Sequence, residues 1–318
     1  MNLTYLPDIT CPSCGRTIKS RGYVPNSRGG AASASGYESC LRQCPPCGLG
    51  FSNAKHDQVD TLTLIYRDPF WNVPDFIADG HRDVLSGALN VVNRPSKLLK
   101  FASVKSEDHV TWTVFRSLSL SGQLDEFAKL AGVDVVGTCD PKILFWGSAH
   151  PDDLRSTERL RSALVDVLCG LGEDTVSHSE PDVIVDFGDS GIVFVEVKLG
   201  ADNAQKPPEY AGWPRYTRDA KCFSVDADDV HRCGTYQLVR NWRILDELAG
   251  DRPGILVNLA PQSLINGADL PALMKFQHII EATSARGFIA FSWERLLSAI
   301  PNQPRWFREY LSDREVVA

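Results

Sequence analysis

Charged side chains interrupt an apolar segment in the middle of the chain, where residues 180–200 read EPDVIVDFGDSGIVFVEVKLG. The GDSG stretch is typical of a turn between two strands. If residues 188–190 form the loop, Asp182 lies opposite Glu196, and Glu196 shares one strand face with Lys198. Opposed residues lie about 5 Å apart at Cβ. The pattern therefore predicts two carboxylates and one ammonium group at one end of a hairpin.

These groups suit a divalent metal ion and a hydrolytic reaction. Two carboxylates held together are costly unless a cation compensates them. Mg²⁺, or Mn²⁺ in its place, prefers oxygen ligands, keeps bound waters and accepts phosphate oxygens, and a bound ion makes water a better nucleophile. Lys198 could orient that water or stabilise charge on phosphorus. The alternative is that Asp182 is an acid that starts a turn after a proline and that Glu196 and Lys198 form a surface salt bridge on one sheet face.

Pro181-Asp182, thirteen intervening residues and Glu196-Val197-Lys198 resemble the motif of the PD-(D/E)xK nuclease superfamily. The resemblance implies that the motif lies on adjacent strands of a mixed sheet flanked by helices. It also implies that Asp182 and Glu196 bind Mg²⁺, that the Val197 carbonyl adds a ligand, and that Lys198 assists the attacking water.

Two further residues fit this resemblance, which covers about residues 105–260. Many members of the superfamily add a carboxylate from an early helix, and Glu107 matches that placement. Some have a glutamine in the helix after the motif, and Gln237 is its counterpart here. The resemblance implies cleavage of DNA, with RNA not excluded, and bacterial members often serve in restriction or phage defence.

Cysteines gather near the N-terminus, where CPSCG at 11–15 is repeated as CPPCG at 44–48. A tight turn in each repeat lets two thiolates point at one ion. Together the repeats offer four sulfurs for a closed tetrahedral Zn²⁺ site: Cys11, Cys14, Cys44 and Cys47. The repeat resembles the zinc-ribbon family over about residues 9–52. The alternative is two thiol pairs of a redox protein, and Cys40 is interpreted as a spare thiol.

The segment between the repeats is rich in basic residues, namely Arg16, Lys19, Arg21, Arg28 and Arg42. Residues 1–60 hold six Lys or Arg against four Asp or Glu, so this region is slightly positive. Such a ribbon suits contact with a phosphate backbone. A purely structural ribbon that docks on the next domain explains it equally well.

Strand-like and helix-like patterns alternate after the cysteines. We expect a zinc ribbon at 1–58 and a nuclease-like domain at 59–318. Strands are predicted at 61–66, 142–147, 254–260 and 287–292 in addition to the hairpin. Helices are predicted at 106–120, 152–170, 235–249 and 268–285. The fold class is therefore α/β (α+β), with a restriction-endonuclease-like mixed central sheet between helices.

Aromatic and basic residues interleave in residues 206–223, directly after the hairpin. Rings stack on bases and cations hold phosphates. The substrate-binding candidates are Lys206, Trp213, Arg215, Arg218 and Lys221. The alternative is a surface loop whose aromatic rings cap the core.

The overall composition limits the function classes. A net charge of −7 counts mildly against strong non-specific binding to nucleic acid. There is no signal peptide and no apolar run of roughly 18 residues, so we expect a cytoplasmic protein without membrane contact. The primary hypothesis is an Mg²⁺-dependent deoxyribonuclease, most simply an endonuclease, with a partner protein or a second copy of the chain left open. The alternative is a non-catalytic adaptor that binds nucleic acid or protein and has a nuclease-like core.

Overall fold

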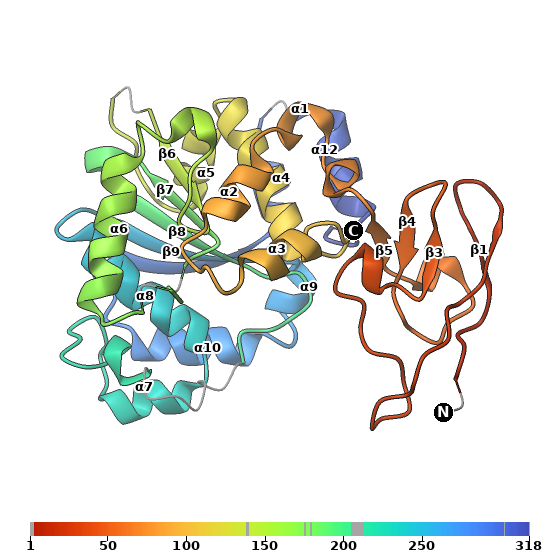
Figure 1. The fold of residues 1–318 in the computed structure, drawn as a ribbon. Coiled ribbons are helices and arrows are strands. Elements are labelled where there is room, and N and C mark those ends of the chain that lie inside the picture. The colour runs from red at the N-terminus through yellow and green to blue at the C-terminus, as the bar shows by residue number, and fades with distance from the viewer. Residues whose placement is uncertain are drawn as a thin grey trace. The chain divides into compact units, whose positions relative to one another are not determined.

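The computed structural model describes residues 3–137, 140–174, 176–178, 180–204, 213–301 and 303–317. The chain divides into two compact units (Figure 1). The first contains Met1–Asp79 and Asn93–Thr113, and the second contains Gly80–Val92 and Val114–Ala318.

Short strands and turns build the first unit. An antiparallel hairpin consists of β1 (Ile9–Thr10) and β2 (Thr17–Ile18), and a three-stranded antiparallel sheet has the order β3 (Arg42–Cys44), β4 (Leu49–Phe51), β5 (Leu64–Tyr66). The helical elements are η1 (Tyr37–Ser39), η2 (Val59–Thr61), η3 (Pro69–Asn72), α1 (Asp75–Ala78), α3 (Arg94–Lys100) and the start of α4 (Glu107–Leu120). Because β5 pairs with β4, the small sheet continues past residue 58.

Few apolar side chains form the core around the small strands of this unit. The buried cluster consists of Ile9, Cys11, Ile18, Cys44, Leu49, Phe51 and Leu62. Two cysteines of the repeated motifs belong to it, so a part of this core is also a set of potential metal ligands. A core of this size gains little free energy from burial alone, and small domains of this kind commonly rely on a bound metal.

Arg42 connects the loops around this core through hydrogen bonds. Its side chain is fully buried, and its guanidinium donates hydrogen bonds to four backbone carbonyls. The acceptors are Pro7 (3.3 Å), His56 (2.6 Å), Ser52 (2.9 Å) and Ala54 (2.6 Å). The sequence placed Arg42 among residues suited to a phosphate backbone, but its donors are already used inside the protein. It acts as a structural cross-link, because a guanidinium offers five donors in a rigid fork.

A five-stranded mixed sheet is the centre of the second unit. Its order is β10 (Arg286–Ser292), β9 (Gly254–Ala260), β8 (Ile192–Val197), β7 (Val183–Asp186), β6 (Lys142–Phe145). The β6–β7 and β7–β8 pairs are antiparallel, and the β8–β9 and β9–β10 pairs are parallel. The mixed α/β architecture predicted from the sequence is therefore confirmed.

Helices cover both faces of this sheet. The helices of the unit are α2 (His81–Gly87), the end of α4, α5 (Leu124–Leu130), α6 (Glu158–Gly170), α7 (Ala227–Cys233), α8 (Tyr236–Ala249), α9 (Gln262–Ile265), α10 (Leu270–Ile279), α11 (Trp293–Ala299) and α12 (Arg305–Ser312). Leu144, Ile184, Phe194 and Leu256 lie in one buried cluster with residues of α6, α8 and α10. Figure 1 shows α8 and α10 on one side of the sheet and α5 on the other. The side chains of even-numbered β8 residues therefore face α8.

Two predicted helices are shorter than expected. The helix predicted at 152–170 begins at Glu158, because Pro151–Asp153 form a separate 3-10 turn (η4). The helix predicted at 268–285 ends at Ile279, because Ile280 turns extended and forms a β-bridge with Phe223. Both differences arise from local turns and bridges that a helical period does not reveal.

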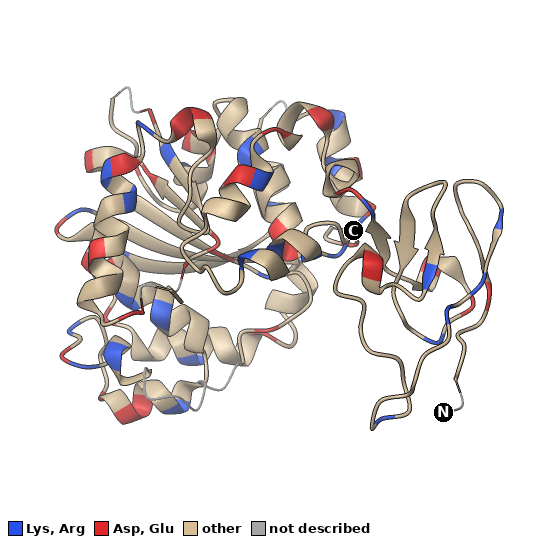
Figure 2. Cartoon of the chain, in the orientation of Figure 1, with Lys and Arg blue, Asp and Glu red and all other residues tan. Residues whose placement is uncertain are grey.

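Charges of both signs alternate along the surface helices. For example, α6 contains the acidic residues Glu158 and Asp166 and, between them, the basic residues Arg159 and Arg161. Figure 2 shows both charge signs along this helix. Among the described ranges, no helix combines the length and the apolar character needed to cross a membrane.

We predict that Arg42→Lys destabilises the small sheet. A lysine cannot reach four carbonyls as a fork does, and each buried acceptor left unpaired costs about 1–3 kcal/mol. Amide hydrogen exchange of β3 and β4 should accelerate roughly thirtyfold, which corresponds to about 2 kcal/mol. Arg28→Lys is the control, because Arg28 is exposed. Equal protection in both variants would contradict the structural role of Arg42.

Candidate functional site

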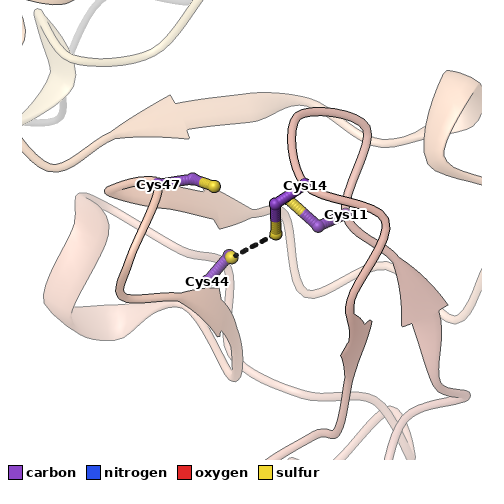
Figure 3. A group of neighbouring side chains, drawn as sticks. All are labelled: Cys11, Cys14, Cys44 and Cys47. Atoms are coloured by element: carbon purple, nitrogen blue, oxygen red, sulfur yellow. Dashed lines mark hydrogen bonds between the residues drawn. The ribbon is translucent and has the colours of Figure 1, made fainter.

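Four cysteines of the first unit lie close enough together to hold one metal ion (Figure 3). The Sγ atoms of Cys11, Cys14, Cys44 and Cys47 all lie within 4.8 Å of one another, and 3.6 Å separates those of Cys14 and Cys44. None of the four forms a disulfide. A tetrahedral Zn²⁺ site with Zn–S bonds of about 2.3 Å needs sulfurs roughly 3.8 Å apart. The cluster therefore fits a metal such as zinc.

In each repeat a backbone hydrogen bond closes a tight turn around the C-x-x-C pair, although the bonded residues differ between the two. The Gly15 N–H donates to the Cys11 carbonyl (2.9 Å), and the Cys47 N–H donates to the Cys44 carbonyl (3.1 Å). Gly15 and Gly48 have φ angles of 71° and 63°. Side chains are disfavoured in this left-handed region, so glycine is the favoured residue after each C-x-x-C pair. The spacing in the sequence thus reflects a required backbone turn.

The thiols differ in how readily they ionise. A backbone hydrogen bond at Arg16 lowers the pKa of Cys14 to about 7, whereas burial raises the pKa of Cys44 to about 12. Since metal ligation requires thiolates, zinc binding must release protons and strengthen as pH rises. Cys40 lies outside the cluster: its Sγ contacts the Gly36 carbonyl (3.5 Å), and burial raises its pKa to about 11.

The hairpin of the second unit has the register predicted from its turn. Gly188–Ser190 (η5) form the loop, and β7 pairs with β8 through Val183↔Val195 and Asp186↔Ile192. Continued one position beyond the Val183↔Val195 pair, this register sets Asp182 opposite Glu196. The Asp182 Oδ2 accepts a hydrogen bond of 2.9 Å from the N–H of Val197. The two carboxylates therefore share one end of the strand pair.

Glu196 and Lys198 form a buried ion pair rather than a surface salt bridge. Their exposed fractions are 2% and 3%, and 2.6 Å separates the Lys198 Nζ from the Glu196 Oε1. Lys198 also donates to the Gln237 Oε1 of α8 at 2.8 Å. The Lys198 N–H bonds the Leu259 carbonyl (2.9 Å), so the β8–β9 pairing continues and keeps Lys198 on the face of Glu196. The structure thus brings Gln237, a candidate from the sequence, to the motif lysine.

The charge state of Glu196 follows from these neighbours. Burial alone would raise the pKa of its carboxyl, but the Lys198 ammonium and the Arg240 guanidinium outweigh that effect and lower it. Hydrogen bonds from Lys198 and Asn241 act in the same direction. Glu196 is therefore a buried carboxylate held ionised at neutral pH.

Sequence reasoning missed several polar residues that surround Glu196. Asn241 of α8 donates to its Oε2 at 2.7 Å, and Arg240 donates to the Asn241 Oδ1. Asn258 of β9 is the register partner of Glu196 and is fully buried. The signal was present, since Asn241 lies on the apolar face of a helical pattern and Asn258 lies within GILVNLA.

Two metal-site candidates remain predictions. Glu107 is the first residue of α4, as expected, but it belongs to the first unit whereas Asp182 and Glu196 belong to the second. The Val197 side chain is fully buried, and its N–H contacts Asp182. Its carbonyl is therefore carried forward as a proposed ligand, and Glu107 stays a prediction from the sequence. Among the described residues, the cysteine cluster is where three or more potential metal-binding side chains meet.

The substrate-binding candidates divide by exposure. Trp213 is only 6% exposed and packs against the rings of Tyr216 and Tyr236, so the alternative that it caps the core fits better than base stacking. Arg218 and Lys221 are exposed, and Arg215 is half-buried. Lys206 lies outside the described residues.

Comparisons of the chain with protein-family models, curated proteins and solved structures each found no match.

We predict one Zn²⁺ per chain, bound by the four cysteines. Cys11→Ser or Cys44→Ser should remove most of the zinc, because oxygen replaces a thiolate ligand. Cys40→Ser should retain it, since Cys40 lies outside the cluster. Elemental analysis of the purified variants measures this, and a zinc-free wild-type protein would overturn the assignment.

We also predict that Glu196→Gln weakens folding in a pH-dependent way. A lowered folded-state pKa contributes stability above the unfolded-state pKa and loses it as pH falls through the folded-state value. At pH 7 the change should cost about 3 kcal/mol, since it leaves Lys198 buried without its counter-charge. The deficit should shrink below about pH 4.

Denaturant unfolding from pH 3 to pH 8 measures the deficit. Glu126→Gln is the matched control, because the Glu126–Lys129 pair is exposed and such pairs contribute about 1 kcal/mol or less. A deficit independent of pH would contradict an ionised Glu196.

Proposed function

We propose that the second unit is a metal-dependent nuclease that hydrolyses phosphodiester bonds in DNA. The observation that carries the proposal is the convergence of Asp182, Glu196 and Lys198 at one end of the β7–β8 pair, with Gln237 against the lysine. These are the residues that resemble the PD-(D/E)xK motif. The mixed sheet, with the motif on adjacent antiparallel strands, agrees with the architecture which that resemblance implies.

The donor set suits a hard divalent cation. Asp182 and Glu196 offer carboxylate oxygens from adjacent strands, which Mg²⁺ or Mn²⁺ prefers. In the proposal these two residues hold the ion, with the Val197 carbonyl as a further ligand. When bound, the ion would polarise the phosphate and lower the pKa of an attacking water.

The protein's own groups have separate tasks in this scheme. Glu196 is kept ionised by Lys198 and Arg240, so it is ready to bind a cation without first losing a proton. Lys198, held by Gln237, places a positive charge where it can orient water and stabilise negative charge developing on phosphorus. Burial strengthens these electrostatic effects, because little water competes for the groups.

A non-catalytic adaptor is the alternative, and the Lys198–Glu196 ion pair has to be weighed under both proposals. The Lys198–Glu196 pair is complete without a cation, as a purely structural buried ion pair would be. Such pairs often add little stability compared with apolar residues of the same volume. A fold that needed only stability would therefore gain little from this pair, which favours the catalytic proposal.

We expect Asp182→Ala, Glu196→Ala and Lys198→Met each to reduce DNA cleavage roughly a hundredfold or more. The carboxylate variants should also weaken Mn²⁺ binding, because each loses an oxygen ligand. Lys198→Met should leave Mn²⁺ affinity within about twofold, since an ammonium cannot be a ligand. Lys129→Ala on the surface of α5 is the control and should cleave normally.

The measurements are plasmid nicking with Mg²⁺, with and without EDTA, and Mn²⁺ calorimetry. Circular dichroism establishes that each variant is folded. Cleavage that persists undiminished in Glu196→Ala, or in EDTA, would reject the metal-dependent mechanism. Folded wild-type protein that neither binds Mn²⁺ nor cleaves DNA or RNA would favour the adaptor.

A further inference from the structure

Glu196 is held from both ends of its carboxylate. Its Oε1 accepts from the Lys198 Nζ at 2.6 Å, and its Oε2 accepts from the Asn241 Nδ2 at 2.7 Å. The first contact comes from its own strand and the second from α8. Because each carboxylate oxygen has two lone pairs, both contacts leave room for a cation. Because Lys198 bonds one oxygen and Asn241 bonds the other, the Asn241 contact fixes the rotation of the carboxylate plane.

Arg240 in turn fixes the orientation of the Asn241 amide. The Arg240 Nε and Nη2 lie 3.2 Å and 3.1 Å from the Asn241 Oδ1. A guanidinium can only donate hydrogen bonds, so the amide atom that faces it must be the oxygen. The amide nitrogen is then directed to Glu196. A reversed amide would place two donors against each other and two acceptors against each other.

Further contacts hold Arg240 itself. Its guanidinium lies 5.9 Å from the centre of the Tyr236 ring and 3.5 Å from the Glu180 carbonyl. Asn241 is fully buried, so an unpaired amide there would be costly. Neighbouring residues of one helix thus form a chain from Arg240 through Asn241 to Glu196.

We infer that Asn241 is a positioning residue that holds Glu196 in the orientation needed to ligate the catalytic cation, and that Arg240 locks its amide. The inference rests on the proposed function for the identity of the cation. Groups that orient a metal ligand from behind typically contribute ten- to a hundredfold to metal affinity. Neither residue touches the cation in this arrangement, and both act through Glu196.

The test is a double-mutant cycle on Mn²⁺ binding to the full chain. Asn241→Leu keeps the number and branching of the side-chain heavy atoms and lacks the donor, and we expect it to weaken Mn²⁺ binding about tenfold. In a Glu196→Ala background the same change should have less than about a twofold effect, because its target is gone. Arg240→Lys keeps the positive charge but loses the fork, and it should weaken binding in the same direction.

Val239→Ala is the matched control, because Val239 is buried on the same helix and belongs to the apolar cluster. It should reduce stability and leave Mn²⁺ affinity unchanged. An equal loss for Asn241→Leu with and without Glu196 would overturn the positioning role, as would unchanged affinity in folded Asn241→Leu.

A second readout separates this inference from the proposed function. The Asn241–Glu196 coupling should also appear in the unfolding free energy measured without metal. Coupling in stability together with no Mn²⁺ binding by the wild-type protein would reject the cation and the nuclease, but keep the hydrogen-bond chain. Mn²⁺ binding without coupling between Asn241 and Glu196 would reject the positioning role of Asn241 but keep the metal site of the proposed function.

Discussion

The ion pair between Lys198 and Glu196 is the contact around which the second unit is arranged. Charges so deeply buried are tolerated only when every donor and acceptor has a partner. That requirement explains why α8 faces the sheet with Gln237 and Asn241 at positions where an apolar core would place aliphatic side chains. It also explains why the hairpin register is strict, since a slip of one residue would turn Glu196 to the opposite face of β8.

The first unit has a small apolar core and depends on polar contacts for its stability. Its core is too small to hold the loops by apolar burial alone, so polar contacts do much of that work. Arg42 gathers four carbonyls, and the paired C-x-x-C-G turns direct four sulfurs to one point. The second unit therefore tolerates buried charge because its core is large, whereas the first adds a buried guanidinium and a cysteine cluster that fits a metal to a small apolar core.

The sequence predicted most of this arrangement where chemistry is local. The cysteine cluster, the hairpin loop and the register of Asp182 against Glu196 depend on turns of a few residues, and their spacing is visible in the chain. The contacts of Arg42, Asn241 and Trp213 were missed or misjudged, because each depends on partners brought close only by the tertiary fold. The predicted start of the helix that begins at Glu158 and the predicted end of the helix that ends at Ile279 were wrong for a related reason. A local turn or a β-bridge interrupts the helix where the helical pattern of the sequence continues.

The cysteine cluster joins two segments that lie thirty residues apart in the chain. A metal held there closes the intervening segment into a loop whose ends are fixed. The entropic cost of such a loop grows slowly with length, by about 0.6 kcal/mol for each doubling. The closed loop can therefore accept insertions and deletions with little loss of stability, and its outer surface can change while the four sulfurs stay in place.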